Sequence, residues 1–306
     1  MPIGASTRGY VAGKYGLELG GQMAGWVASA SGGGATSDVI AEKLGVDHLI
    51  RKHIGGLKYT EIEVHVGTGM SKDFYDWIKS SFAHTYGRKD GAILVADYNG
   101  NEVSRLEFTH ALISEIGFPA LDASSKDAAL MVVKLAPEVT RFKKATGKIH
   151  TAETTIHKKW LPSNFRLRID GLDCTRVNKI ESLVVKQKNV DNPVGEMRDY
   201  QREPAYLEIP NLVVTLAESH SADWYKWHED FVIRGNNGED QVKSGTLELL
   251  AANLQDTLFT INFKHTGIFR LEPERVETHS DAIRRVTAQL YVEDMQFEVG
   301  GAASAK

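Results

Sequence analysis

Apolar and polar residues alternate along much of the chain. The segment TEIEVHVG at residues 60–67 places Ile or Val at every second position, and FRLRIDGL at residues 165–172 follows the same pattern. A period of two predicts β-strands with one face toward a core and the other toward water. Further strands are predicted by segments rich in β-branched and aromatic residues. These segments are residues 103–113, 129–135, 257–269 and 285–299.

Two segments carry a helical pattern instead. SKDFYDWIKSSF at residues 71–82 has a large apolar residue every three or four positions, after a serine suited to an N-cap, and SADWYKWHEDFV at residues 221–232 repeats this arrangement. Each segment predicts an amphipathic helix whose apolar stripe faces a core. We therefore expect a mainly β protein in which each half is an antiparallel β-sandwich or half-open barrel with one inserted helix.

The same series of motifs occurs twice in the chain. For example, KLAPEVTRF at residues 134–142 has the counterpart QLYVEDMQF at residues 289–297, a spacing of 155 residues. Six such pairs follow one another in the same order, and the spacing drifts only in polar or Gly-rich stretches, where loops accept insertions. Two tandem copies of one domain are therefore predicted. Recurring structural positions are Tyr59, Trp77 and His110 in the first copy, and Tyr206, Trp227 and His265 in the second.

The motif order also suggests domain boundaries. We expect a first domain at residues 1–142, a linker rich in Lys and Thr at 143–160, a second domain at 161–299 and a flexible tail at 300–306. The stretch SASGGGATS at residues 29–37 contains three successive glycines, which predict a mobile loop inside the first domain.

Composition narrows the class of protein. The chain has 306 residues, of which 42% are hydrophobic and 25% charged, as in ordinary globular proteins. Its net charge of −4 gives no electrostatic reason to expect nucleic-acid binding. The single cysteine, Cys174, excludes an intramolecular disulfide. Because no apolar run approaches membrane-spanning length, we expect no membrane contact.

Residue types that could support catalysis are present, but they lack the necessary spacing. There are eleven histidines, yet no His-x-x-x-His or Cys-x-x-Cys motif occurs. Cys174 has no neighbouring histidine that could act as its base. We expect no catalytic, metal-binding or cofactor-binding residues and no cofactor. Since His110 and His265 recur in the repeat, a structural role is predicted for both.

Three segments of the first copy resemble a known family. They are HIGGLKYTEIEVHVGTGMSKDFYDWI, RKDGAILVADYNGNEVSRLEF and DASSKDAALMVVKLAPE. Together they resemble the tail tube protein family of contractile phages, which is shared with extracellular contractile injection systems. Lys89-Asp90-Gly91, Asn101-Glu102-Val103 and the run Lys134–Glu138 occupy the family's motif positions. The second copy departs further, with Ser244-Gly245 in place of Asp-Gly, so its assignment rests on the internal repeat.

The resemblance implies a structural protein made of two tandem tail-tube-like domains, and not an enzyme. Such domains form six-membered rings that stack into a tube inside a contractile sheath. Implied partners are further copies of the chain, with three or six chains per ring, the tail sheath protein, and baseplate or spike proteins. DNA or protein cargo would pass through the lumen without specific binding. The implied location is a virion tail or injection-system particle assembled in the bacterial cytoplasm.

Two alternatives to a plain tube subunit stay open. Three chains with two copies each would complete a pseudo-hexameric ring, which suits a baseplate hub or a tube initiator or adaptor. A different class is a two-domain β module that binds carbohydrate or peptide through the aromatic clusters around Trp77 and Trp227. This last alternative requires both tryptophans to be exposed.

Overall fold

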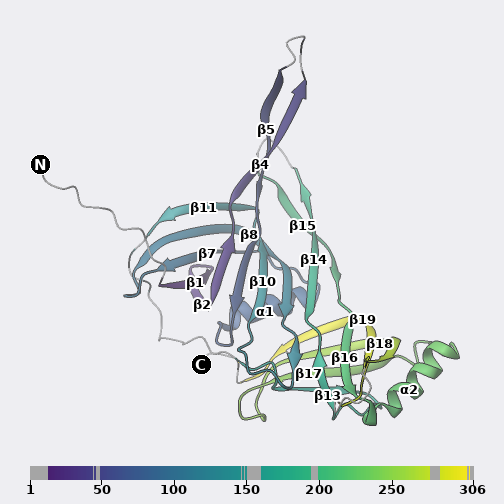
Figure 1. The fold of residues 1–306 in the computed structure, drawn as a ribbon. Helices are drawn as coiled ribbons and strands as arrows, with labels where there is room; N and C mark the ends of the chain where they lie inside the picture. Colours follow the sequence, from purple (N-terminus) through teal and green to yellow (C-terminus); the bar gives the residue numbers. More distant parts are fainter. Residues whose placement is uncertain are drawn as a thin grey trace, which may run out of the picture.

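Two antiparallel sheets form the body of the protein (Figure 1). The computed structural model describes residues 13–43, 45, 49–145, 147, 149, 160–193, 199–275, 283–301 and 303. The protein is mainly β, as predicted from the alternating pattern. The expected linker falls largely outside the described residues, as does most of the expected tail.

The first half of the chain contributes eleven strands and one α-helix to the described structure. These are β1 (Lys14–Leu19), β2 (Gln22–Val27), β3 (Ser29–Gly32), β4 (Ala35–Lys43), β5 (Ile50–Tyr59), β6 (Ile62–Val66), α1 (Lys72–Phe82), β7 (Lys89–Ala96), β8 (Glu102–Phe118), β9 (Leu121–Asp122), β10 (Met131–Ala136) and β11 (Val139–Lys144). The second half contributes β12 (Phe165–Ile169), β13 (Val177–Ile180), β14 (Leu183–Asn192), β15 (Gln201–Glu208), β16 (Leu212–Ala217), α2 (Ala222–His228), β17 (Lys243–Leu250), β18 (Thr257–Pro273) and β19 (Arg285–Val299).

Strand pairing follows the same order in the two sheets. The first sheet contains the path β1-β7-β8-β10-β6-β3, and the second contains β12-β17-β18-β19-β16-β13. The strand β19 takes the places of both β10 and β11, which pair with successive parts of β8. Pro137 lies between β10 and β11, whereas Val292 occupies the matching place in β19. Because proline has no N–H to donate to a ladder, the strand is interrupted only in the first copy.

Both predicted helices are present, but they differ in length. Ser71 caps α1, and its hydroxyl accepts a hydrogen bond from the Phe74 backbone N–H at 3.3 Å. In α2 the matching Ser221 hydroxyl instead donates to the Glu218 carbonyl at 2.6 Å. The regular part of α2 ends at His228, and a wider π-helical turn continues through residues Glu229–Ile233.

The Gly-rich segment 29–37 is not a loop, contrary to our prediction. It forms β3 and the start of β4, which a short glycine bend joins. Gly32 and Gly33 both have positive φ, of 89° and 75°. A Cβ atom on Gly32 would overlap the Glu61 carbonyl oxygen. The glycines therefore allow a left-handed bend and close strand contact rather than mobility.

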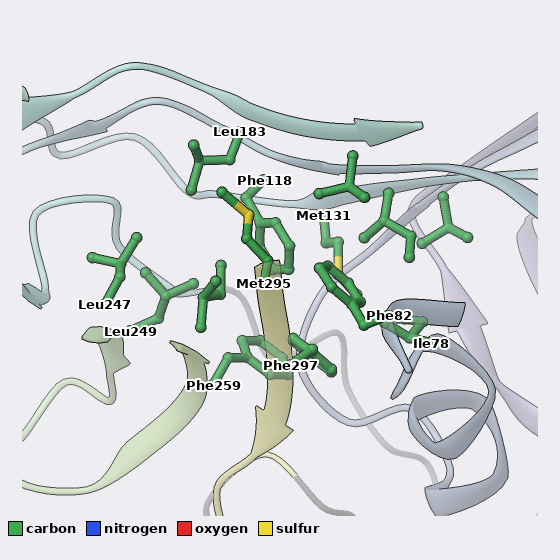
Figure 2. Close-up of a cluster of buried hydrophobic side chains, with 14 of the residues drawn as sticks. Ile78, Phe82, Phe118, Met131, Leu183, Leu247, Leu249, Phe259, Met295 and Phe297 are labelled. Atoms are coloured by element: carbon green, nitrogen blue, oxygen red, sulfur yellow. The ribbon is translucent and has the colours of Figure 1, made fainter. Parts of the chain in front are cut away.

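A continuous apolar core joins the two halves. Figure 2 shows Phe82 of α1, Phe118 of β8 and Phe297 of β19 in one cluster. The Phe297 ring stacks on Phe82 at a centroid distance of 5.8 Å and lies 5.9 Å from Phe118. The second sheet therefore packs against the helix of the first half, and α2 lies at the outer end of the molecule (Figure 1).

Two glycines at matching positions provide a stability test. A Cβ atom on Gly91 or Gly245 would collide with the backbone oxygen of Glu18 or Arg168 on the adjacent strand. We expect Gly91→Ala and Gly245→Ala each to lower the free energy of unfolding by about 1–3 kcal/mol, because the strands must separate. Urea denaturation measures the change. The control is Gly301→Ala, which meets no atom within 4 Å. Equal stability of all three variants would contradict the prediction.

Candidate functional site

The recurring tryptophans are core residues in both copies. Trp77 is buried, and its indole N–H donates to the Gly87 carbonyl at 2.6 Å. Trp227 is also buried, with the Lys243 ammonium 5.3 Å from its ring centroid. Trp77 is 1% exposed and Trp227 is 8% exposed. The carbohydrate- or peptide-binding alternative requires both tryptophans to be exposed, so their burial counts against it.

The recurring histidines mark a bend in each long strand. His110 in β8 and His265 in β18 have φ values of 51° and 50°, a left-handed conformation that few residues other than glycine adopt. His110 lies between the part of β8 that pairs with β11 and the part that pairs with β10. Each imidazole also lies beside a glutamate, with Nδ1–Oε2 distances of 3.0 Å to Glu138 and 3.5 Å to Glu293.

Substitution of His110 tests this backbone role. Valine is β-branched and strongly disfavours positive φ, whereas asparagine tolerates it, and both remove the imidazole. We expect His110→Val to unfold at a lower urea concentration than His110→Asn, with a difference of about 1–2 kcal/mol. His265 should show the same order. A similar loss for Val and Asn would mean that the imidazole contact, rather than the bend, determines stability.

Strands of the second half complete the edge of the first sheet. β14 pairs with β8 from Leu183↔Phe118 to Lys186↔Glu115. β9 in turn pairs with β13 of the second sheet through Asp122↔Lys179. Each half therefore supplies backbone hydrogen bonds to the other, and we call this region the junction.

The hairpin β14–β15 adds a polar part to the junction. The Arg202 backbone N–H donates to Glu138 Oε1 at 2.8 Å, and the Arg202 guanidinium donates to the Tyr59 carbonyl at 3.1 Å. The Tyr59 hydroxyl donates to Asp199 Oδ1 at 3.0 Å. Tyr59 is buried by these contacts, whereas its repeat counterpart Tyr206 is exposed. The same tyrosine therefore has different environments in the two copies.

The helix α1 provides the apolar part of the junction. Its Tyr75 ring lies 5.6 Å from Phe259 of the second sheet, and burial raises the pKa of Tyr75 to about 12. The Tyr75 hydroxyl faces the backbone N–H groups of Gly69 and Met70, at 3.3 and 3.4 Å. Together with the Phe82–Phe297 stack, these contacts fix α1 between the two sheets.

The face of the first sheet that points away from the core carries paired charges. Lys134 lies 3.0 Å from a Glu115 oxygen and 3.7 Å from a Glu63 oxygen on the adjacent strands. The hydrogen bond with Glu115 raises the pKa of Lys134. Val64 and Val133 occupy the opposite, buried face, as the alternating pattern predicts.

Within the described residues, no group of three or more His, Cys, Asp or Glu side chains is placed to hold a metal ion. None of the helices in this part of the chain has the length and apolar character to span a bilayer.

Cys174 is half-buried, and this burial raises the pKa of its thiol to about 11. Because the thiolate is the reactive form, the folded protein should react slowly with iodoacetamide at neutral pH. We expect the alkylation rate to rise with pH until about pH 11 in the folded protein. In urea the midpoint should move to about pH 8.5. Coincident pH profiles for the folded and unfolded protein would contradict this prediction.

Sequence reasoning singled out Tyr59 but not the junction to which it belongs. Phe118 and Arg202 fall in none of the aligned motifs, and each contacts a residue distant in the sequence. The available signal was the aligned pair KLAPEVTRF and QLYVEDMQF, in which Glu138 and Glu293 coincide.

Comparison with known proteins finds a family match within the first half of the chain. Residues 11–141 match the family "T4-like virus tail tube protein gp19". No curated protein sequence matches the chain. The matched residues make up less than half of the chain.

Solved structures of contractile injection systems contain similar chains. One, from a PVC sheath–tube complex in the extended state, has a TM-score of 0.40 and 21% identity over 45% of this chain and 94% of that chain. Another, from the PVC sheath/tube terminator, has a TM-score of 0.41 and 22% identity over 45% of this chain and 99% of that chain. A third, from the tube-terminating cap of the anti-feeding prophage, has a TM-score of 0.39 and 20% identity over 47% of this chain and 100% of that chain.

Proposed function

We propose that the protein is a structural subunit of the tail tube in a contractile phage tail or contractile injection system. Its copies would stack in rings around a channel through which DNA or effector proteins pass. The observation that carries the proposal is the junction, where β14 extends the sheet of a tail tube family domain at its β8 edge. A unit whose sheet edge is completed by a second, similar unit is suited to annular assembly.

The arrangement of the first sheet also supports a conduit. Its inner face is apolar and buried, while its other face carries the paired charges of Lys134, Glu63 and Glu115. Such a face can remain hydrated in a lumen without offering a specific binding site. A tube of this kind inside a sheath would have the sheath protein and the baseplate as its partners.

A second candidate is a baseplate hub or a tube initiator. The repeated strand order favours it, because three chains with two similar units each would form a pseudo-hexameric ring. For both candidates we propose two domains, at residues 1–142 and 161–299, with residues 143–160 as their connection.

Negative-stain microscopy of the purified chain tests the proposal. We expect annular particles with a central hole at high protein concentration, and stacks of these particles if the chain is a tube subunit. End-on views distinguish three from six chains per ring, and three chains without stacking would favour the hub. Monodisperse monomers at high concentration in several buffers would contradict both candidates.

A further inference from the structure

We infer that each chain binds the next copy of itself head to tail, with α2 of one copy packed on the exposed sheet face around Phe142 of the other. The inference rests on the proposed function, because it specifies how subunits meet. Its basis is the junction within one chain, where α1 already occupies the matching face of the second sheet.

The helices provide the first comparison. Tyr75 and Phe82 of α1 are each only 2% exposed, because Phe259 and Phe297 of the second sheet cover them. At a spacing of 150 residues, Tyr225 and Val232 stand in their places on the second helix. Tyr225 is 39% exposed and Val232 is 42% exposed. The second helical segment thus presents the same apolar positions to solvent, since no second sheet lies beyond it.

The first sheet, on which α2 of another copy would pack, also has an exposed residue whose counterpart in the second sheet is buried. Phe297 is 1% exposed under α1, whereas Phe142, its counterpart 155 residues earlier, is 76% exposed. Phe142 borders a hollow lined also by Ile93, Val95 and Leu106. The counterparts of Ile93 and Val95 are Leu247 and Leu249, which Figure 2 shows in the cluster that receives α1. The first sheet therefore has an apolar face of the kind that accepts a helix.

The polar residues of the junction show the same difference in burial between the two copies. Glu138 accepts the Arg202 N–H, and its side chain is 9% exposed. Its counterpart Glu293 is 61% exposed. The β8 residues that pair with β14 correspond to Arg270–Pro273 of β18, and among the described strands only β19 pairs with them. That edge can accept the hairpin β4–β5, which projects from the first half with exposed Val39 and Ile54 (Figure 1).

The two surfaces cannot satisfy each other within one chain. β11, which carries Phe142, and α2 lie at opposite ends of the molecule (Figure 1). A contact between different patches on identical chains is heterologous, so its repetition forms a ring or a helical filament. The contact between the second half of one chain and the first half of the next would then resemble the junction between the two halves of a single chain. Every unit in the assembly would then have equivalent neighbours.

Single-cysteine variants test this contact. The variants Phe142→Cys and Val232→Cys are made in a Cys174→Ser background, which removes the native thiol. Both positions are exposed, so folding should be preserved, and circular dichroism checks this. Their counterparts Phe297 and Phe82 have ring centroids 5.8 Å apart, so a bismaleimide whose spacer replaces the two rings can bridge the new thiols. We expect the bismaleimide to convert an equimolar mixture into covalent dimers, and either variant alone to give none.

A charge at the centre of the surface provides an independent readout. We expect Phe142→Asp to abolish rings in negative stain and to sediment as a monomer, because a carboxylate would be buried against α2. The matched control is Tyr98→Asp, since Tyr98 is also 76% exposed but lies in the turn between β7 and β8. The control should form rings like the unsubstituted protein.

The outcomes separate this inference from the proposed function. If the unsubstituted protein forms rings but the mixture gives no cross-link and Phe142→Asp still assembles, the head-to-tail contact is wrong while the tube role stands. Dimers formed by one variant alone would indicate a symmetric contact and also overturn the inference. If the unsubstituted protein forms no oligomer, both the contact and the proposed function fail.

Discussion

The structure depends on one constraint, which is that the backbone groups at a sheet edge must find hydrogen-bond partners. Strand β8 continues beyond its pairing with β7, and its last residues are buried. An unpaired N–H or C=O in that position would cost about 1–3 kcal/mol. β14 from the second half provides the missing ladder. The two halves are therefore joined by the requirement of a strand edge as much as by their shared apolar core.

His110 and His265 bend the two long strands β8 and β18, each of 17 residues. A left-handed residue can introduce a bulge that redirects a strand. In β8 the part before His110 pairs with β11 and the part after it with β10, whereas β19 pairs with both parts of β18. Asp90 stabilises the first bend by accepting the His110 backbone N–H at 2.7 Å. Ser244 occupies the matching position in the second copy.

Much of the fold could be predicted because it depends on local patterns. Alternation predicted the strands, and the spacing around Trp77 predicted α1. The repeat identified tryptophan and histidine positions that both copies use in the same way, although Tyr59 and Tyr206 differ in burial. The Gly-rich segment was misjudged because three glycines allow either mobility or close packing, and only the position of the Glu61 carbonyl distinguishes the two. Proximity of this kind depends on tertiary structure, which a single sequence does not contain. The junction was missed for the same reason, since β8 and β14 are distant in the chain.

A tandem repeat offers a comparison that a single domain does not. Two similar residues in similar folds should be equally buried unless one copy has a neighbour that the other lacks. Phe297 and Phe142 differ in burial, as do Glu138 and Glu293, and in each pair the buried member lies at the junction. For the phenylalanines local strand pairing cannot account for the difference, because Phe142 pairs with Leu106 of β8 as Phe297 pairs with Ile261 of β18. This difference in burial is the reason for proposing that another chain covers Phe142.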